Sequence, residues 1–298
     1  MAFFVYVFMA HSIALVDFSY IMYKSRFHYK SMARCDASGA LFPIGHIYGV
    51  FGLIQQLSSQ FKAVILCVDS HAPHRYEALP EYKSGRHVAT GNPFEDYNIM
   101  NDLGGLLGLC TYLKNVFYIK HAGMESDDII ASWIATAGDK WDLHCYFNDN
   151  DILQTKGDYH WHQSFDKPEV DRRTYINDKY GINLDYLPIW YKVVRGDSSD
   201  HIPVSIFRFP TKKLISICEA SENDCFSIGW FYEAAGLITK DGKITNKDAA
   251  EAVSRNLRVV SPRILDVSEF KLARFNLTRE EGMELLSFYQ INNFVLEV

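Results

Sequence analysis

The sequence lacks the paired cysteines that would mark a zinc ribbon or a disulfide framework. Its six cysteines are scattered and none forms a Cys-x-x-Cys pair: Cys35, Cys67, Cys110, Cys145, Cys218 and Cys225. Cysteines used in this way are typical of a protein in a reducing compartment, so we expect a cytoplasmic location.

The sequence also lacks a membrane-spanning run and a signal peptide. The apolar residues 1–10 are too few to cross a bilayer, and no basic region precedes them. We therefore expect no membrane partner. We interpret residues 1–8 as peripheral and Met9 as an alternative start.

An excess of positive charge is missing as well. The net charge of the 298 residues is −6, whereas nucleic-acid-binding proteins are usually basic. The total misleads if many acids are concentrated in one metal site. Without the nine carboxylates assigned to such a site below, the rest of the chain has a net charge of +3, which is compatible with DNA binding.

What is present centres on Glu125-Ser126-Asp127-Asp128. Apolar residues at 129, 130, 133 and 134 follow with helical spacing, so this stretch predicts the start of an amphipathic helix. Acids at a helix N-terminus are favoured by the helix dipole. On this stretch alone, that explanation and a functional one are equally supported.

Four short apolar runs predict buried parallel strands: 13–16, 64–68, 116–119 and 144–147. Helical patterns over 45–60, 94–114 and 125–137 lie between them, which indicates a parallel α/β sheet. Each run ends at or just before an acid: Asp17, Asp69, Glu125, and Asp149 with Asp151.

A single Asp after a strand commonly caps the next helix, but capping does not explain acids after all four strands. The carboxyl ends of parallel strands meet at one edge, where ligands bind. Carboxylates packed together repel one another, and a divalent cation relieves that repulsion. Oxygen ligands without His or Cys favour Mg²⁺ or Mn²⁺.

Basic and aromatic residues interleave over residues 71–87, which include Arg75, Tyr82, Lys83 and Arg86. This composition suits contact with phosphates. Composition alone favours an ordinary solvated loop, whereas the position directly after an acidic strand end favours the functional interpretation.

Beyond residue 160 the strand pattern fades. Helices are predicted over 171–180, 186–194, 211–219, 246–260 and 278–290. We therefore expect an α/β domain over residues 1–165, followed by a mainly helical region over 166–298, in a monomeric protein.

In order and spacing, the motifs resemble the flap-endonuclease family of 5′ nucleases, most closely its bacteriophage branch of phage RNase H and phage 5′–3′ exonucleases. The resemblance rests on Leu15-Val16-Asp17-Phe18-Ser19, Cys67-Val68-Asp69, residues 79–86, residues 125–128, Asn148-Asp149-Asn150-Asp151 and residues 196–200. It implies a PIN-like nuclease domain with a helical arch.

The resemblance also implies the site residues. One metal would be surrounded by Asp17, Asp69, Glu125, Asp127 and Asp149, and a second approached by Asp151, Asp197 and Asp200, with Asp149 between the two and Asp128 in a supporting position. Lys83 and Arg86 match the basic pair at the base of the arch, Tyr82 matches a residue that stacks on the terminal nucleotide, and Arg75 falls in the same substrate-binding segment.

Residues 202–213 depart from the family pattern. Family members carry a glycine-rich helix–turn–helix here that binds duplex DNA and often a K⁺ ion, and these glycines are absent. The absence of these glycines argues against K⁺ binding. Arg208, Lys212 and Lys213 are expected either to contact phosphates or to form a solvated basic surface.

The implied function is a two-metal, Mg²⁺-dependent 5′–3′ exonuclease or flap endonuclease that accepts Mn²⁺ and removes primers as RNase H does. Its partners would be DNA and RNA–DNA with 5′ ends or flaps, and a single-strand binding protein or other replication machinery, in the host bacterial cytoplasm if phage-encoded. Alternatives are a PIN-type ribonuclease, a DNA-structure-binding protein without catalysis, and a small-molecule hydrolase.

Overall fold

The computed structural model describes residues 12–36, 38–84, 90–92, 94–164, 167–182, 184, 187–220 and 227–291. The expectations about residues 1–8 and Met9 lie outside these ranges. Within them, no helix is both long and apolar enough to cross a bilayer.

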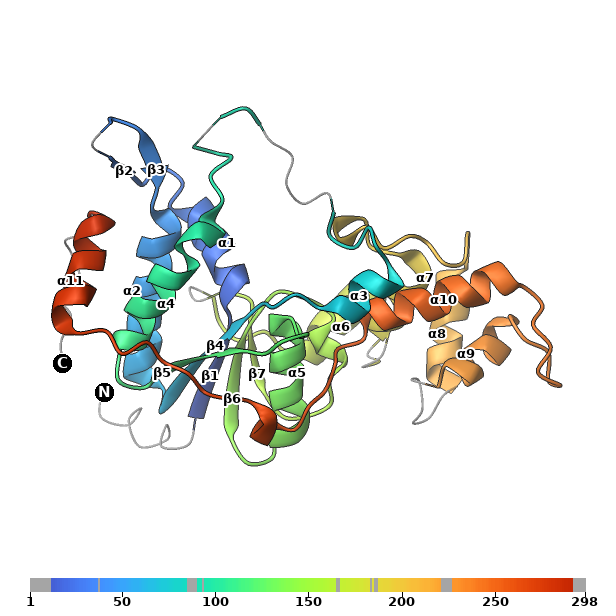
Figure 1. Ribbon diagram of the computed structural model, residues 1–298. Coiled ribbons are helices and arrows are strands. Elements are labelled where there is room, and N and C mark those ends of the chain that lie inside the picture. The colour runs from blue at the N-terminus through green and yellow to red at the C-terminus, as the bar shows by residue number, and fades with distance from the viewer. Residues whose placement is uncertain are drawn as a thin grey trace.

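A five-stranded parallel sheet forms the centre of the first half, in the order β5-β4-β1-β6-β7 (Figure 1). The four predicted strands are all present, and the parallel α/β prediction is confirmed. The fifth strand was not predicted because it contains only three residues, two of them histidines. The strands are β1 (Ser12–Asp17), β4 (Ala63–Val68), β5 (Val116–Lys120), β6 (Asp142–Tyr146) and β7 (His160–His162).

Helices cover both faces of the sheet. Alternate side chains of β1 point to opposite faces: Ala14 and Val16 pack in one core, Ile13 and Leu15 in another. The first core also contains α1 (Phe18–His28), α2 (Gly45–Gln60) and α4 (Leu103–Tyr112), and the second contains α5 (Ser126–Ala137). The helix predicted over 94–114 is shorter than expected, since only the turn η1 (Ile99–Asp102) and α4 are helical.

The crossover after β4 begins with α3 (Pro73–Ala78). Turns follow at 79–84, and the described residues of 90–98 form no helix. Residues 85–89 and 93, which include Arg86, lie outside the described part of the chain. A small hairpin of β2 (Ala33–Cys35) and β3 (Leu41–Pro43) lies on the side of the molecule where the chain enters α4 (Figure 1).

Helices of the second half surround a core of their own, in which Trp190 stacks on Phe231 with ring centroids 4.0 Å apart. Leu79 and Tyr82 join this core, which ties the segment after α3 to the helical half. The helices are α6 (Arg172–Tyr180), α7 (Leu187–Arg195), α8 (Thr211–Ala220), α9 (Ile228–Ala235) and α10 (Lys247–Val260), with the turn η3 (Ser198–Asp200) after α7.

After α10 the chain returns to the α/β half (Figure 1). It passes the turn η4 (Val267–Glu269), and Ala273 then exchanges backbone hydrogen bonds of 2.9 and 3.0 Å with Tyr118 of β5. The last helix, α11 (Arg279–Phe288), packs on α4 and places Leu286 in the first core. The final helix therefore belongs with the sheet rather than with the other C-terminal helices.

This return predicts that α11 contributes to the stability of the α/β half. Leu286 is 2% exposed, so Leu286→Ala should lower the free energy of unfolding by about 2–5 kcal/mol, the usual effect of truncating a buried leucine. Urea denaturation measures the change.

Met283 on the same helix is 47% exposed, and Met283→Ala should change the free energy of unfolding by no more than about 0.5 kcal/mol. Equal effects of the two substitutions would contradict the docking of α11.

Candidate active site

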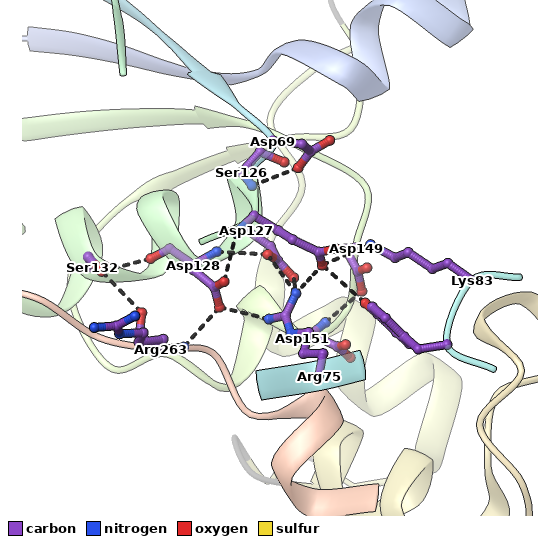
Figure 2. Close-up of polar contacts among 12 residues, drawn as sticks. Asp69, Arg75, Lys83, Ser126, Asp127, Asp128, Ser132, Asp149, Asp151 and Arg263 are labelled. Carbon is purple, nitrogen blue, oxygen red and sulfur yellow. Dashed lines mark hydrogen bonds and ion pairs between the residues drawn. The ribbon is translucent and has the colours of Figure 1, made fainter. Parts of the chain in front are cut away.

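Two carboxylates lie at the carboxyl ends of the neighbouring strands β1 and β4. Asp17 ends β1 and caps α1, where it accepts a hydrogen bond of 3.0 Å from the backbone N–H of Tyr20. Asp69 follows β4 and accepts one of 2.8 Å from the backbone N–H of Ser126, the first residue of α5 (Figure 2). Burial, with Asp69 nearby, raises the pKa of Asp17 to about 8.

The acids at the start of α5 are held by the helix itself. Glu125 is the N-cap residue, and its backbone N–H donates to Asp128 over 2.9 Å in a capping box. Asp128 also accepts a hydrogen bond of 2.8 Å from the backbone N–H of Arg263, on the segment that returns from α10. The explanation from helix capping is therefore correct for Glu125 and Asp128, but it leaves their burial unexplained.

Arg75 of α3 compensates these buried charges. It is 1% exposed, forms an ion pair with Glu125, and places its guanidinium 2.7 Å from Asp128 and 3.4 Å from Asp127 (Figure 2). Burial disfavours the charged guanidinium, but the three carboxylates outweigh it and raise the pKa of Arg75. Burial and the charge of Asp127 nevertheless raise the pKa of Asp128 to about 7.

Lys83 and Tyr82 approach the same cluster from the segment after α3. The Lys83 ammonium lies 2.8 Å from Glu125, and the Tyr82 hydroxyl donates to Glu125 over 3.1 Å. Tyr82 is 4% exposed and its ring packs in the helical core. In this position Tyr82 orients Glu125, and its ring presents no open face for a nucleotide to stack on.

A second group of carboxylates surrounds Lys192 of α7. The Lys192 ammonium lies 3.3 Å from Asp149, 2.9 Å from Asp151 and 3.1 Å from Asp197. Burial and the charge of Asp149 raise the pKa of Asp151 to about 8. Burial is the largest effect on Asp149 and favours its protonated form, but Lys192, the backbone N–H of Asp151 and the charge of Lys83 together outweigh burial and hold the pKa of that carboxyl below its usual range.

The last acid of the set, Asp200, is buried in the turn η3, and its carbonyl accepts a hydrogen bond of 3.1 Å from the Lys83 N–H. The structure thus brings the nine predicted carboxylates to one region between the sheet edge and the helical half. The role of Lys192 was not predicted from the sequence. The only sequence feature that marks this residue is its position one turn before Gly196-Asp197, in a helix with many buried residues.

The predicted basic residues differ in their surroundings. Arg75 is enclosed by carboxylates, and Lys213 donates to the Ala235 carbonyl over 3.1 Å. Lys212 is exposed on α8, and Arg208 lies over the ring of Phe207. Arg86 lies outside the described residues.

Comparisons with known proteins identify the family and the fold of the chain. Residues 12–181 match the family model of the 5′–3′ exonuclease, N-terminal resolvase-like domain. The zinc-bound 5′-exonuclease of bacteriophage T5 superposes with a TM-score of 0.63 at 17% identity, covering 93% of this chain and 99% of that one. A comparison with curated protein sequences gives no match.

Two further structures from bacteriophage T5 are similar. The D15 protein co-crystallized with metal ions has a TM-score of 0.60 at 17% identity, covering 93% of this chain and 99% of that one. A pseudo-enzyme–product complex of the D15 flap endonuclease with DNA and metal ions has a TM-score of 0.60 at 16% identity, with 94% and 99% covered. At these identities the structural likeness establishes the fold.

The raised pKa values predict how stability depends on pH without metal. Asp17 holds its proton more tightly in the folded state, with a pKa of about 8 against an ordinary 3.8, so the free energy of unfolding should fall as pH rises from about 4 to 8. In Asp17→Asn the fall should be smaller by about 2 kcal/mol or more, since each pKa unit corresponds to about 1.4 kcal/mol.

Urea denaturation in EDTA at several pH values measures this difference. Asp139→Asn, at an exposed position, should follow the wild type. Parallel curves for wild type and Asp17→Asn would contradict the raised pKa of the Asp17 carboxyl in the folded protein.

Proposed function

The chain belongs to the 5′–3′ exonuclease family, and from this premise we propose that it is a divalent-metal-dependent, structure-specific 5′ nuclease. Its substrates are DNA and RNA–DNA with 5′ ends or flaps, which it cleaves by phosphodiester hydrolysis. Removal of primers or flaps during phage DNA replication or repair is the role that fits this substrate class.

The observation that carries the proposal is the gathering of carboxylates from both halves of the chain. Asp17 and Asp69 come from strand ends, the acids at 125–128 from α5, and Asp197 and Asp200 from the turn after α7. Oxygen donors alone fit Mg²⁺ or Mn²⁺. Burial, and after it a neighbouring carboxylate, raises the pKa values of Asp17 and Asp151, and a bound divalent cation would compensate both effects.

These residues divide into two candidate ligand sets. Asp17, Asp69, Glu125, Asp127 and Asp149 would hold one ion, and Asp151, Asp197 and Asp200 a second, with Asp149 placed between the two ions and shared by both sets. Bound Mg²⁺ would supply a water of lowered pKa and positive charge against the reacting phosphate. Arg75 and Lys192 hold the carboxylates in place through the ion pairs described above.

Lys83 is the residue best placed to meet the substrate. Its ammonium contacts Glu125 at the acidic cluster. The Lys83 N–H bond to the Asp200 carbonyl fixes its backbone, at φ +57°, against the helical half. A cation held in this way can stabilise negative charge that develops on a phosphate.

Residues 202–213 supply the proposed duplex-binding surface. Lys212 and Arg208 lie on the helical half, beyond the turn that carries Asp197 and Asp200. Contacts from these side chains to the DNA backbone would add affinity without base recognition, so that the shape of the DNA decides which substrate is cleaved.

The first test is cleavage of a 5′-labelled flap duplex. With Mg²⁺ the wild type should release short 5′ products. EDTA should abolish cleavage, and so should Asp149→Asn, because the variant loses a carboxylate shared by both ligand sets while its DNA binding remains. Flap binding without cleavage by folded wild type would instead support a DNA-structure-binding protein.

Lys83→Met should lower kcat on the flap about 100- to 1,000-fold, as expected for the loss of a charge that acts on the transition state. Lys140→Met, at an exposed surface position, is the matched control and should retain activity. Hydrolysis of a chromogenic phosphate monoester by wild type and Lys83→Met is measured as well. If the monoester were cleaved rapidly and Lys83→Met left that cleavage intact, the protein would be a small-molecule hydrolase.

A further inference from the structure

A second group of potential metal ligands lies at the opposite end of strand β6. Asp142 begins β6, His144 follows two residues later, and His160 begins the edge strand β7. One ligand atom from each of these side chains lies within 4.8 Å of the other two. We propose that Asp142, His144 and His160 bind a transition-metal ion, for which Zn²⁺ is the best fit.

The sheet register brings these three side chains together. His144 pairs with His160 across the parallel strands, and Asp142 lies two residues before His144 on the same face of β6. The two imidazole rings are stacked with centroids 4.4 Å apart. Three ligands are thus contributed by two adjacent strands of a rigid sheet.

The distances between ligand atoms suit a small cation. The Nε2 atom of His160 lies 3.0 Å from one oxygen of Asp142, and that of His144 lies 3.5 Å from the other. In a tetrahedral site with metal–ligand bonds of about 2.0–2.1 Å, neighbouring ligand atoms are about 3.3 Å apart. The observed values lie on either side of this distance.

The other nitrogen of each ring already has a partner. Nδ1 of His160 lies 2.9 Å from Glu169, and Nδ1 of His144 lies 3.0 Å from Nε2 of His162. Histidines that bind metals characteristically use their second nitrogen in this way, which fixes the ring and its tautomer. When Nδ1–H of His160 donates to Glu169, its Nε2 lone pair faces the carboxylate of Asp142, and a cation between these two acceptors satisfies both.

This site differs from the acidic one in position and in chemistry. Asp142 starts β6, whereas Asp149 follows its end, so the length of the strand, roughly 15 Å, separates them. Imidazole nitrogen favours Zn²⁺, Ni²⁺ and Cu²⁺, and carboxylate oxygen favours Mg²⁺. The side chain of His160 is 43% exposed, which leaves the site open to ions from solvent.

A metal here would act on the sheet rather than on the phosphate. β6 and β7 flank the loop over 147–159, which carries Asp149 and Asp151. An ion bound at the start of both strands would hold the three-residue edge strand β7 against β6 and thereby fix both ends of this loop.

The test is a calorimetric titration of the full chain with Zn²⁺ in a large excess of Mg²⁺, which occupies carboxylate sites. The wild type should bind one Zn²⁺ per chain. His160→Ala should weaken this binding more than 100-fold, and Glu169→Gln about 10- to 100-fold, as is usual for a residue that orients a ligand. His28→Ala, which removes an exposed histidine elsewhere, is the control and should bind as the wild type does.

Thermal denaturation gives a second measure. Zn²⁺ should raise the Tm of wild type and of His28→Ala, but not that of His160→Ala. Identical Zn²⁺ binding and identical Tm shifts in wild type and His160→Ala would overturn the proposal and leave His160 as a hydrogen-bonding partner of Asp142 and Glu169. Because nuclease activity is not measured in either experiment, the outcome is independent of the proposed function.

Discussion

The buried guanidinium of Arg75 is the constraint on which the site depends. Glu125, Asp127 and Asp128 start one helix out of solvent, and their mutual repulsion would oppose folding without a cation among them. Removing one partner from such a group leaves unpaired buried charge, which typically costs about 3–5 kcal/mol. The first role of Arg75 is therefore to allow these acids to be buried. Its position on α3 then brings the next turn, with Tyr82 and Lys83, against Glu125.

Lys192 compensates the charge of a second group of carboxylates from the other half of the chain. It lies on a helix of the second core, yet its ammonium is held by Asp149 and Asp151 from the sheet edge and by Asp197 from the turn after its own helix. The two halves are thus joined through the charges of the site itself. A change of ionisation of these carboxylates therefore acts on the contact between the halves.

The sequence predicted the sheet and most helices because their apolar periodicity is local, and the bounds of α2 agree with the prediction. The gathering of acids at one edge followed from the rule for parallel strands. The roles of Arg75 and Lys192 could not be predicted, because composition does not tell which cation a fold buries. Nor could the return of α11, whose contact with α4 joins segments far apart in the chain. Tyr82 was expected to meet a nucleotide, but its aromatic ring is used in the helical core.

Strand β6 shows why ligand chemistry must be considered together with register. Its C-terminal end leads to Asp149 and Asp151, which the ammonium of Lys192 holds, whereas its first residues place an aspartate beside stacked imidazoles. His144 and His160 are far apart in the sequence, and only the pairing of β6 with β7 makes them neighbours. Because β7 is too short and too polar to be predicted as a strand, the histidines carry no signal in the sequence. The two proposed sites thus offer oxygen donors at one end of the sheet and nitrogen donors at the other, and these donors suit different metal ions.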